Sequence, residues 1–298
     1  DYENVGTKVS KKLSDKINII TSVNAFSSQG NSYVKNSLVI STTNLRNDNK
    51  IIEICKKNNL SVIAMEYVPR IARAQKLDAL SSQASITGYK AGLIVANSLN
   101  KYIPLMMTAA GTLLPANVLV LGAGVAGLQA IATAKRMGAI VFATDVRIAS
   151  KEQVESLGAK FIMVEDEETR GAETSGGYAK EMSEEYKKKQ STLIAQTISK
   201  QDIVICTALI PGKKAPVLIT EEMVSSMIPG SVVIDLAVEA GGNCPLSKMN
   251  EIVVHNGVKI VGNSFLASEL SHDSSNLFSN NVFNFLNYVI KDGKMINE

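Results

Sequence analysis

The feature that most constrains the fold of this chain is a strand pattern that runs directly into three closely spaced glycines. Residues 118–121 are uniformly apolar, and the sequence Gly-Ala-Gly-Val-Ala-Gly occupies 122–127. A helical pattern follows through residues 128–136, and a second apolar run at 140–144 ends on Asp145. This order of strand, glycine turn, helix, strand and acid predicts a dinucleotide-binding βαβ unit.

Each part of this unit has a physical role. Gly122 permits the tight turn, Gly124 lets the backbone approach a pyrophosphate, and Gly127 lets the helix pack closely on the strand. The helix N-terminus adds N–H groups and the positive end of a dipole. Asp145 can accept hydrogen bonds from a ribose diol and would repel the 2′-phosphate of NADP, so the pattern predicts NAD(H). The alternative is a glycine-rich helix start in which the glycines have only a packing role. Arg147 either lies beside the adenosine or is a solvated surface charge.

Composition is that of a globular protein and argues against several classes of function. The 298 residues are 45% hydrophobic and can form two α/β domains. A net charge of +3, without a basic patch that includes aromatic residues, does not indicate a nucleic-acid partner. Cys55, Cys206 and Cys244 are far apart and form no CxxC pair, which favours a reducing compartment. His255 and His272 have no metal-ligand spacing, so we expect no metal.

The stretch between Lys101 and Lys135 has no charged residue and is long enough to span a bilayer. Pro104, Gly111 and Pro115 interrupt it, as do the glycines of the turn, which must meet phosphates at an aqueous surface. We therefore predict a loop followed by a buried strand and helix.

The remaining patterns predict an α/β fold with two Rossmann-like, doubly wound domains built on parallel sheets. A long helix over 85–102 is expected to link them, and an apolar helix over 277–290 is expected to fold back on the first domain. Strands of the first domain are predicted at 17–20, 38–40 and 61–65. The predicted division is a first domain of residues 1–114 plus 265–298 and an NAD(H)-binding domain of residues 115–264.

Two further segments are candidates for function. Arg70, Gln75, Asp78 and Ser81 follow a strand, and the last three recur every third residue, on one helical face. They could orient a polar carboxamide ring, or form a helix cap with a surface ion pair. The acidic, glycine-containing segment 165–182 is long for a loop in a compact domain, which is typical of a functional lid or of disorder.

Six motifs in the same order resemble the NAD(H)-binding component of proton-translocating nicotinamide nucleotide transhydrogenase, a family related to alanine dehydrogenase. The resemblance covers essentially residues 60–262, with weaker similarity before and after. The motifs begin at Val68 (Val-Pro-Arg-Ile-Ala-Arg-Ala-Gln-Lys-Leu-Asp-Ala-Leu-Ser-Ser), Gly122 (Gly-Ala-Gly-Val-Ala-Gly-Leu), Lys151 (Lys-Glu-Gln-Val-Glu-Ser-Leu-Gly), Gly177 (Gly-Tyr-Ala-Lys-Glu-Met), Thr207 (Thr-Ala-Leu-Ile-Pro-Gly-Lys) and Asp235 (Asp-Leu-Ala-Val-Glu-Ala-Gly-Gly-Asn-Cys).

The resemblance implies roles for the matching residues. It assigns Arg70, Gln75, Asp78 and Ser81 to the nicotinamide end of NAD(H), as catalytic residues. It assigns Tyr178 and Met182 to a mobile loop that closes over the nucleotide. On this basis the residues expected to bind the cofactor are Gly122, Ala123, Gly124, Val125, Ala126, Gly127, Asp145, Val146, Arg147, Tyr178, Met182, Thr207, Ala208, Leu209, Glu239 and Asn243.

The resemblance also implies an activity and partners. Hydride would pass directly from NADH on this chain to NADP⁺ on a separate NADP(H)-binding component, without an acid, base or metal. A membrane component would conduct protons, and this component would be a homodimer. The enzyme would be attached to the inner membrane of a mitochondrion or other organelle, or to a bacterial cytoplasmic membrane.

The sequence departs from the family in two places. Family members carry further residues before the position of Asp1, so we expect an N-terminally truncated first domain. Glu269 stands where the family has an arginine, which puts a contact of that arginine in doubt. An alanine-type amino-acid dehydrogenase is an alternative, but its general base is usually a histidine in the first domain, and this chain has none before His255. A protein that only senses NAD is a third hypothesis.

Overall fold

The computed structural model describes residues 3–10, 13–14, 16–24, 34–43, 49–164, 169, 172, 180, 182–210, 213–291 and 294–295. The chain divides into two compact units, residues 1–80 with 275–298 and residues 81–274. In the part of the chain described, no helix combines the length and apolar character needed to cross a bilayer.

The second unit is built on a seven-stranded sheet in the order β11-β12-β10-β9-β6-β7-β8. All neighbouring strands are parallel except β11 and β12, which form an antiparallel hairpin. Counted from β6, the six parallel strands have the order 3-2-1-4-5-6 of a dinucleotide-binding Rossmann fold. The strands are β6 (Asn117–Leu121), β7 (Ile140–Thr144), β8 (Lys160–Phe161), β9 (Ile203–Cys206), β10 (Val232–Asp235), β11 (Ile252–His255) and β12 (Val258–Val261).

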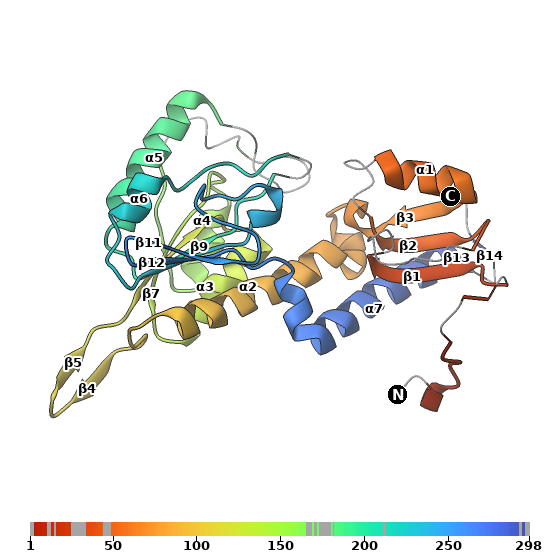
Figure 1. Cartoon of the computed structure of the whole chain (residues 1–298), viewed down its shortest axis with the longest axis horizontal. Coiled ribbons are helices and arrows are strands. Elements are labelled where there is room, and N and C mark those ends of the chain that lie inside the picture. Colours follow the sequence, from red (N-terminus) through yellow and green to blue (C-terminus); the bar gives the residue numbers. More distant parts are fainter. Residues whose placement is uncertain are drawn as a thin grey trace. The chain divides into compact units, whose positions relative to one another are not determined.

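Helices cover both faces of this sheet, which explains why its central strands are apolar at nearly every position (Figure 1). Val118 and Val120 of β6 pack into one buried cluster with α2, α3 and α4, whereas Leu119 and Leu121 pack into a second cluster with α5 and α6. Alternate residues of the strand therefore pack into two separate cores, one on each face, as expected for a doubly wound sheet. The helices are α2 (Ala79–Ser98), α3 (Val125–Arg136), α4 (Ser150–Ser156), α5 (Glu184–Ile198) and α6 (Glu221–Ser225).

Side-chain caps begin two of these helices. The Ser183 hydroxyl accepts a hydrogen bond from the N–H of Tyr186 at the start of α5. The Thr220 hydroxyl accepts one from the N–H of Met223 at the start of α6. Acidic residues follow each cap in the first turn, where the helix dipole favours them. This confirms the predicted helix start at Thr220.

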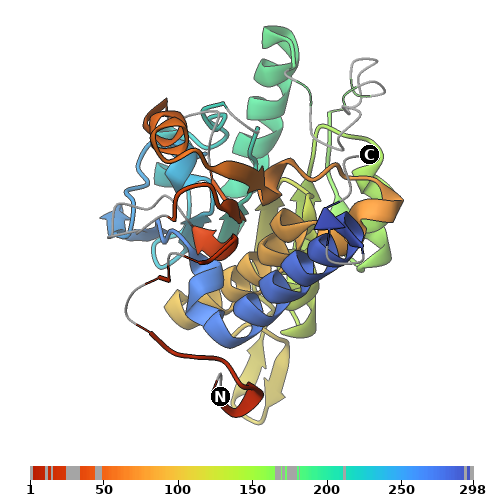
Figure 2. The ribbon, with the colours of Figure 1, turned by 90° about the vertical axis from the view of Figure 1, so that its right-hand side faces the viewer.

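The first unit contains a three-stranded parallel sheet, β1-β2-β3. Its core joins Leu38, Ile40 and Met65 to Phe278 and Val282 of helix α7, which is dark blue in Figure 2. The prediction that the last apolar helix folds back on the first segment of the chain is therefore confirmed. The regular elements that reach into this unit are β1 (Ile19–Asn24), β2 (Leu38–Thr42), α1 (Asn49–Asn58), β3 (Ser61–Ala64), α7 (Ser271–Val289), β13 (Ile290–Lys291) and β14 (Lys294–Met295).

The structure divides the chain at a different place from the boundary predicted at residues 114 and 115. Ala91, Val95 and Leu99 are buried in the core of the second unit, so most of helix α2 belongs there. Helix α2 also begins at Ala79, earlier than the predicted start at Ser85. The predicted assignment of whole domains, with 115–264 as the NAD(H)-binding part, stays a prediction.

A short antiparallel hairpin, β4 (Met106–Thr108) and β5 (Gly111–Leu113), stands in the segment that we predicted to be a loop. It extends outward from the second unit (Figure 1). Lys101 anchors its base, because its Nζ lies 2.9 Å from Oδ2 of Asp202. The same carboxylate oxygen accepts the N–H of Asn117 at 2.8 Å, so the pair ties the hairpin to the start of β6.

Candidate functional site

The glycine turn lies where parallel strands β6 and β9 end side by side. This is the point at which the strand order reverses, and open α/β sheets bind their ligands in the crevice there. Gly122 has φ +99°, a conformation that favours glycine. A Cβ on Gly127 would lie 1.9 Å from the carbonyl oxygen of Gly122, so a side chain at 127 would collide with backbone. The predicted turn and close packing are thus present.

The surroundings of Gly124 are open, in contrast to the crowded surroundings of Gly127. Gly124 is the N-cap residue of the 12-residue helix α3, and no side chain caps the helix there. A Cβ on Gly124 would meet no atom of the described residues within 4 Å, so the space beside Gly124 at the helix N-terminus is open in that part of the chain. The N–H groups of the first turn and the helix dipole make this space suitable for a pyrophosphate. The residues present therefore fit the phosphates of a dinucleotide.

Thr207 holds this turn from the neighbouring strand. Its Oγ1 donates to the carbonyl oxygen of Gly122 at 2.8 Å, with a longer contact of 3.2 Å to that of Leu121. Its backbone N–H also donates to the Leu121 carbonyl oxygen, at 2.8 Å. The threonine predicted to bind the cofactor therefore supports the glycine turn.

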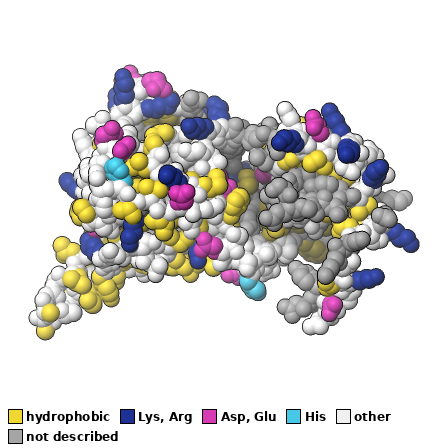
Figure 3. Space-filling view, viewed as in Figure 1, with side chains coloured by type: hydrophobic (Ala, Val, Ile, Leu, Met, Phe, Trp, Pro, Cys, Tyr) yellow, Lys and Arg dark blue, Asp and Glu magenta, His cyan; other side chains and the backbone are white. Residues whose placement is uncertain are grey.

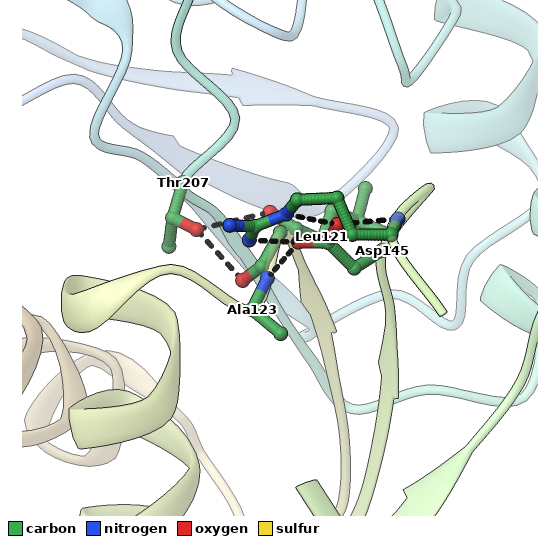
Figure 4. A network of polar contacts seen from close by, with 6 residues as sticks. Leu121, Ala123, Asp145 and Thr207 are labelled. Carbon is green, nitrogen blue, oxygen red and sulfur yellow. Dashed lines mark hydrogen bonds and ion pairs between the residues drawn. The ribbon is translucent and has the colours of Figure 1, made fainter. Parts of the chain in front are cut away.

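Asp145 lies directly after β7 and is the centre of a polar network (Figure 4). Its Oδ2 accepts the N–H of Ala123 at 2.7 Å, which joins the carboxylate to the glycine turn. Its Oδ1 accepts the N–H of Arg147 at 2.9 Å. The Arg147 guanidinium pairs with both oxygens, so Arg147 is not the solvated surface charge of one hypothesis.

Asn243 is fully buried and links two loops at the same edge of the sheet. Its Nδ2 donates to the carbonyl oxygens of Ala208, at 2.9 Å, and Pro216, at 2.8 Å. Its Oδ1 accepts the N–H of Ala208 at 3.1 Å. Asn243 thus fixes the backbone that follows β9.

Asp235 begins one of the six motifs but was not among the predicted site residues, and it supports this edge of the sheet. It is completely buried at the end of β10, and its carboxylate accepts the N–H groups of Ala237 and Cys244 and the hydroxyl of Ser247. It thereby shapes the loop that carries Asn243. The sequence signal that could have identified Asp235 is its place at the end of an apolar strand, which is also the pattern that identified Asp145.

Two buried thiols surround this carboxylate. Burial raises the pKa of the Cys206 thiol well above its ordinary value, and the charge of Asp235 adds to the effect. Burial likewise raises the pKa of Cys244. Both side chains therefore remain protonated thiols, and they fill space in the core.

The other predicted cofactor residues lie in different surroundings. Glu239 is exposed, and its Oε1 accepts the N–H of Phe265 at 2.9 Å. Leu209 is also exposed. Val125 and Ala126 form the first turn of α3.

Of the predicted mobile segment, the structure describes residues 169, 172, 180 and 182. Val146 packs against a buried cluster that contains Ala172, Met182 and Tyr186. Met182 is therefore part of the anchor at the end of that segment. Tyr178 lies outside the described residues.

Of the residues predicted to hold the nicotinamide end, only Gln75 and Ser81 lie in helices, and these are two different helices. The prediction that Gln75, Asp78 and Ser81 share one helical face was therefore wrong. Gln75 is exposed in a 3₁₀ helix, Ala72–Leu77, and Asp78 ends this helix immediately before α2, which contains Ser81. The Nε of Arg70 lies 3.8 Å from Oδ2 of Asp78. The ion pair of the alternative hypothesis is therefore present.

The comparisons with known proteins agree on one family. Residues 91–298 match the model "Alanine dehydrogenase/PNT, C-terminal domain", and residues 1–87 match the corresponding N-terminal domain. Over 247 residues the chain is 60% identical to a protein of Rhodospirillum rubrum that is named as the first portion of NAD(P) transhydrogenase subunit alpha. The match covers 83% of this chain and 64% of that protein. The chain is 51% identical to the protein of the same name from Rickettsia prowazekii, with the same coverage.

Solved structures agree with this relationship. The crystal structure of transhydrogenase from Sinorhizobium meliloti has a TM-score of 0.88 and 44% identity, and the match covers all of this chain and 82% of that one. An L-alanine dehydrogenase structure has a TM-score of 0.68 at 20% identity, covering 85% of this chain and 65% of that one, which shows a shared fold. The chain spans 64% of the length of the Rhodospirillum rubrum relative. The chain belongs to the alanine dehydrogenase/PNT family.

Proposed function

We propose that this chain is the NAD(H)-binding component of a proton-translocating transhydrogenase and takes part in direct hydride transfer to NADP⁺ on a separate component. The observation that carries the proposal is the glycine turn at the switch point of the second sheet, with Asp145 at the end of the adjacent strand. Strong identity to proteins named as NAD(P) transhydrogenase subunit alpha supports this choice within the family.

The chain's own residues would bind and orient the dinucleotide. The N-terminus of α3, behind Gly124, would hold the pyrophosphate, and Thr207 would keep the turn in shape. Asp145 would accept hydrogen bonds from the adenosine ribose. Arg70, Gln75, Asp78 and Ser81 would orient the nicotinamide carboxamide. Bound NAD(H) supplies the hydride, so the protein's task is to hold the ring in place and exclude water.

A homodimer is the second part of the proposal. The β4–β5 hairpin and the residue after it expose large apolar side chains, including Met107 at 75% and Leu114 at 70%. Hydrophobic atoms gather on this projecting arm in Figure 3. Such a surface is typical of a protein–protein contact, and a second copy of the chain would bury it by symmetry. Met107→Lys combined with Leu114→Lys should shift the sedimentation coefficient from dimer to monomer, and an unchanged coefficient would refute a dimer through the hairpin.

The remaining partners are an NADP(H)-binding component and a membrane-spanning component that conducts protons. This chain would be a peripheral part of that membrane-bound enzyme, in a mitochondrial or other organelle inner membrane or in a bacterial cytoplasmic membrane. Proton movement would be coupled to hydride transfer through the other components.

The first test of the proposal measures NADH binding by isothermal titration calorimetry. Gly124→Ala should weaken binding about 100-fold, because the added methyl group occupies the space for the pyrophosphate. The melting temperature should fall by only a few degrees, as for a lost N-cap glycine. Wild-type protein that does not bind NADH would refute the proposal.

The second test mixes the chain with a transhydrogenase NADP(H)-binding component and follows reduction of an NAD⁺ analogue by NADH in the presence of NADP(H). Gln75→Ala should reduce hydride exchange about 100-fold while NADH still binds. Lys76→Ala, an exposed neighbour in the same 3₁₀ helix, is the matched control. Binding without exchange by the wild type would favour a protein that only senses NAD, and oxidative deamination of an amino acid would favour the dehydrogenase alternative.

A further inference from the structure

Asp145 receives two kinds of hydrogen-bond donor in this structure. Two are backbone groups: the N–H of Ala123 donates to Oδ2 at 2.7 Å, and that of Arg147 donates to Oδ1 at 2.9 Å. Two belong to the Arg147 side chain, whose Nε donates to Oδ1 at 2.8 Å and whose Nη2 donates to Oδ2 at 2.7 Å. Each carboxylate oxygen therefore accepts one backbone donor and one guanidinium donor.

The guanidinium pair is largely removed from solvent. The Asp145 side chain is 6% exposed and that of Arg147 is 14% exposed. A bidentate arginine–carboxylate pair has two parallel, charge-assisted hydrogen bonds, which are the stronger class of such contacts. Limited exposure also reduces screening by water and salt. The pair is thus a stable local structure at the end of β7.

A carboxylate offers about four acceptor positions, and the four donors around Asp145 fill them. The two backbone donors are part of the turns that follow β6 and β7. The two guanidinium donors are on a side chain that can rotate away. An adenosine ribose also presents two donors, its 2′- and 3′-hydroxyl groups, to such a carboxylate. The diol and the guanidinium therefore compete for the same two oxygen positions.

We propose that Arg147 is a specificity-determining residue that competes with the adenosine ribose for Asp145 and lowers the affinity for NAD(H). This inference rests on the proposed function, because it requires that Asp145 binds the ribose. Binding then exchanges the ion pair for the diol, and the displaced guanidinium lies near the 2′ position. An arginine near this position accommodates a 2′-phosphate. Arg147 thereby weakens the discrimination against NADP(H) that the carboxylate alone would give.

The proposal makes opposite predictions for two dinucleotides. In Arg147→Ala, NADH should bind about fivefold more tightly, because no ion pair has to be broken. NADPH should bind about fivefold more weakly, because the 2′-phosphate faces an uncompensated carboxylate. Arg147→Lys should have a smaller effect on both, because an ammonium group cannot form the bidentate pair.

The experiment is calorimetric titration of the wild type and the variants with NADH and with NADPH. Arg136→Ala removes an exposed arginine from the same unit and is the matched control, with both affinities unchanged. The expected change in the ratio of the two dissociation constants is about 25-fold for Arg147→Ala. Should that variant fail to fold, Arg147→Lys carries the same test with a smaller shift of the same sign.

Two outcomes overturn the inference and can be told apart. Equal or weaker NADH binding by the Arg147 variants, with normal binding by the wild type, would show that Arg147 does not compete with the ribose. That result would leave the proposed function intact. Failure of the wild type to bind NADH would overturn both the inference and the proposed function.

Discussion

Replacement of Asn243 by alanine tests how the loops around the site are held together. The substitution removes three hydrogen bonds, two to Ala208 and one to Pro216, from a side chain with no exposed surface. A net contribution of about 1 kcal/mol for each bond predicts a loss of about 3 kcal/mol in the free energy of unfolding. The N–H of Ala208, which is half-buried, would also lose its partner, which adds to the cost.

Two measurements check this value. Urea titration followed by circular dichroism should give the loss of about 3 kcal/mol. Hydrogen exchange should show faster exchange in the segment after β9, where the Ala208 N–H is bonded to Asn243. Gln153→Ala, which removes an exposed amide from helix α4, should change the free energy by less than about 0.5 kcal/mol. A loss below about 1 kcal/mol for Asn243→Ala, with unchanged exchange after β9, would refute the assigned role.

Three other predictions follow from burial and packing. Gly127→Ala should abolish NADH binding and lower the melting temperature, although alanine favours helices, because its Cβ would lie 1.9 Å from the Gly122 carbonyl oxygen. A thiol reagent at pH 8 should modify Cys55 before Cys206 and Cys244, which are buried, and all three should react in urea; mass spectrometry identifies the order. Because burial raises the pKa of the two buried thiols, the unfolded chain loses these protons first, and the free energy of unfolding should fall as pH rises above the unfolded value of 9.0. Cys206→Ala should reduce that decrease in urea titrations between pH 8 and about 10.

The dinucleotide-binding unit could be predicted closely from the sequence. The strand predicted at 140–144 is β7, and that at 118–121 lies within β6. Helices cover these strands on both faces, so nearly every position carries the apolar signal. The glycines after the first strand and Asp145 after the second strand occur in the fixed order of a dinucleotide-binding unit, which strengthened the prediction.

The β4–β5 hairpin could not be predicted in the same way. Its residues are exposed or only half-buried, so they show neither the alternation of a half-buried strand nor the continuous burial of a central one. The segment has no charged residues, and its side chains are not packed into a core. A contact with a second chain, which the sequence does not describe, would account for that composition.

The partners of the site residues also lay beyond the sequence pattern. Asn243 bonds to Ala208, a residue 35 positions earlier, and no local spacing connects the two. Arg147 is only two residues from Asp145, yet its sequence position was equally compatible with a solvated side chain. The structure decides between these alternatives because it gives the direction of the guanidinium and its exposure.

The bond from Thr207 to the Gly122 carbonyl oxygen has a consequence for the order of events during synthesis. The two residues are 85 positions apart, so a ribosome that adds about 5–20 residues per second completes the threonine some 4–17 s after the glycine. Until then the glycine turn lacks both this bond and the strand β9 beside it. A dinucleotide therefore cannot guide the nascent chain through its early folding. It can stabilise the unit by mass action only after β9 and Thr207 have been synthesised.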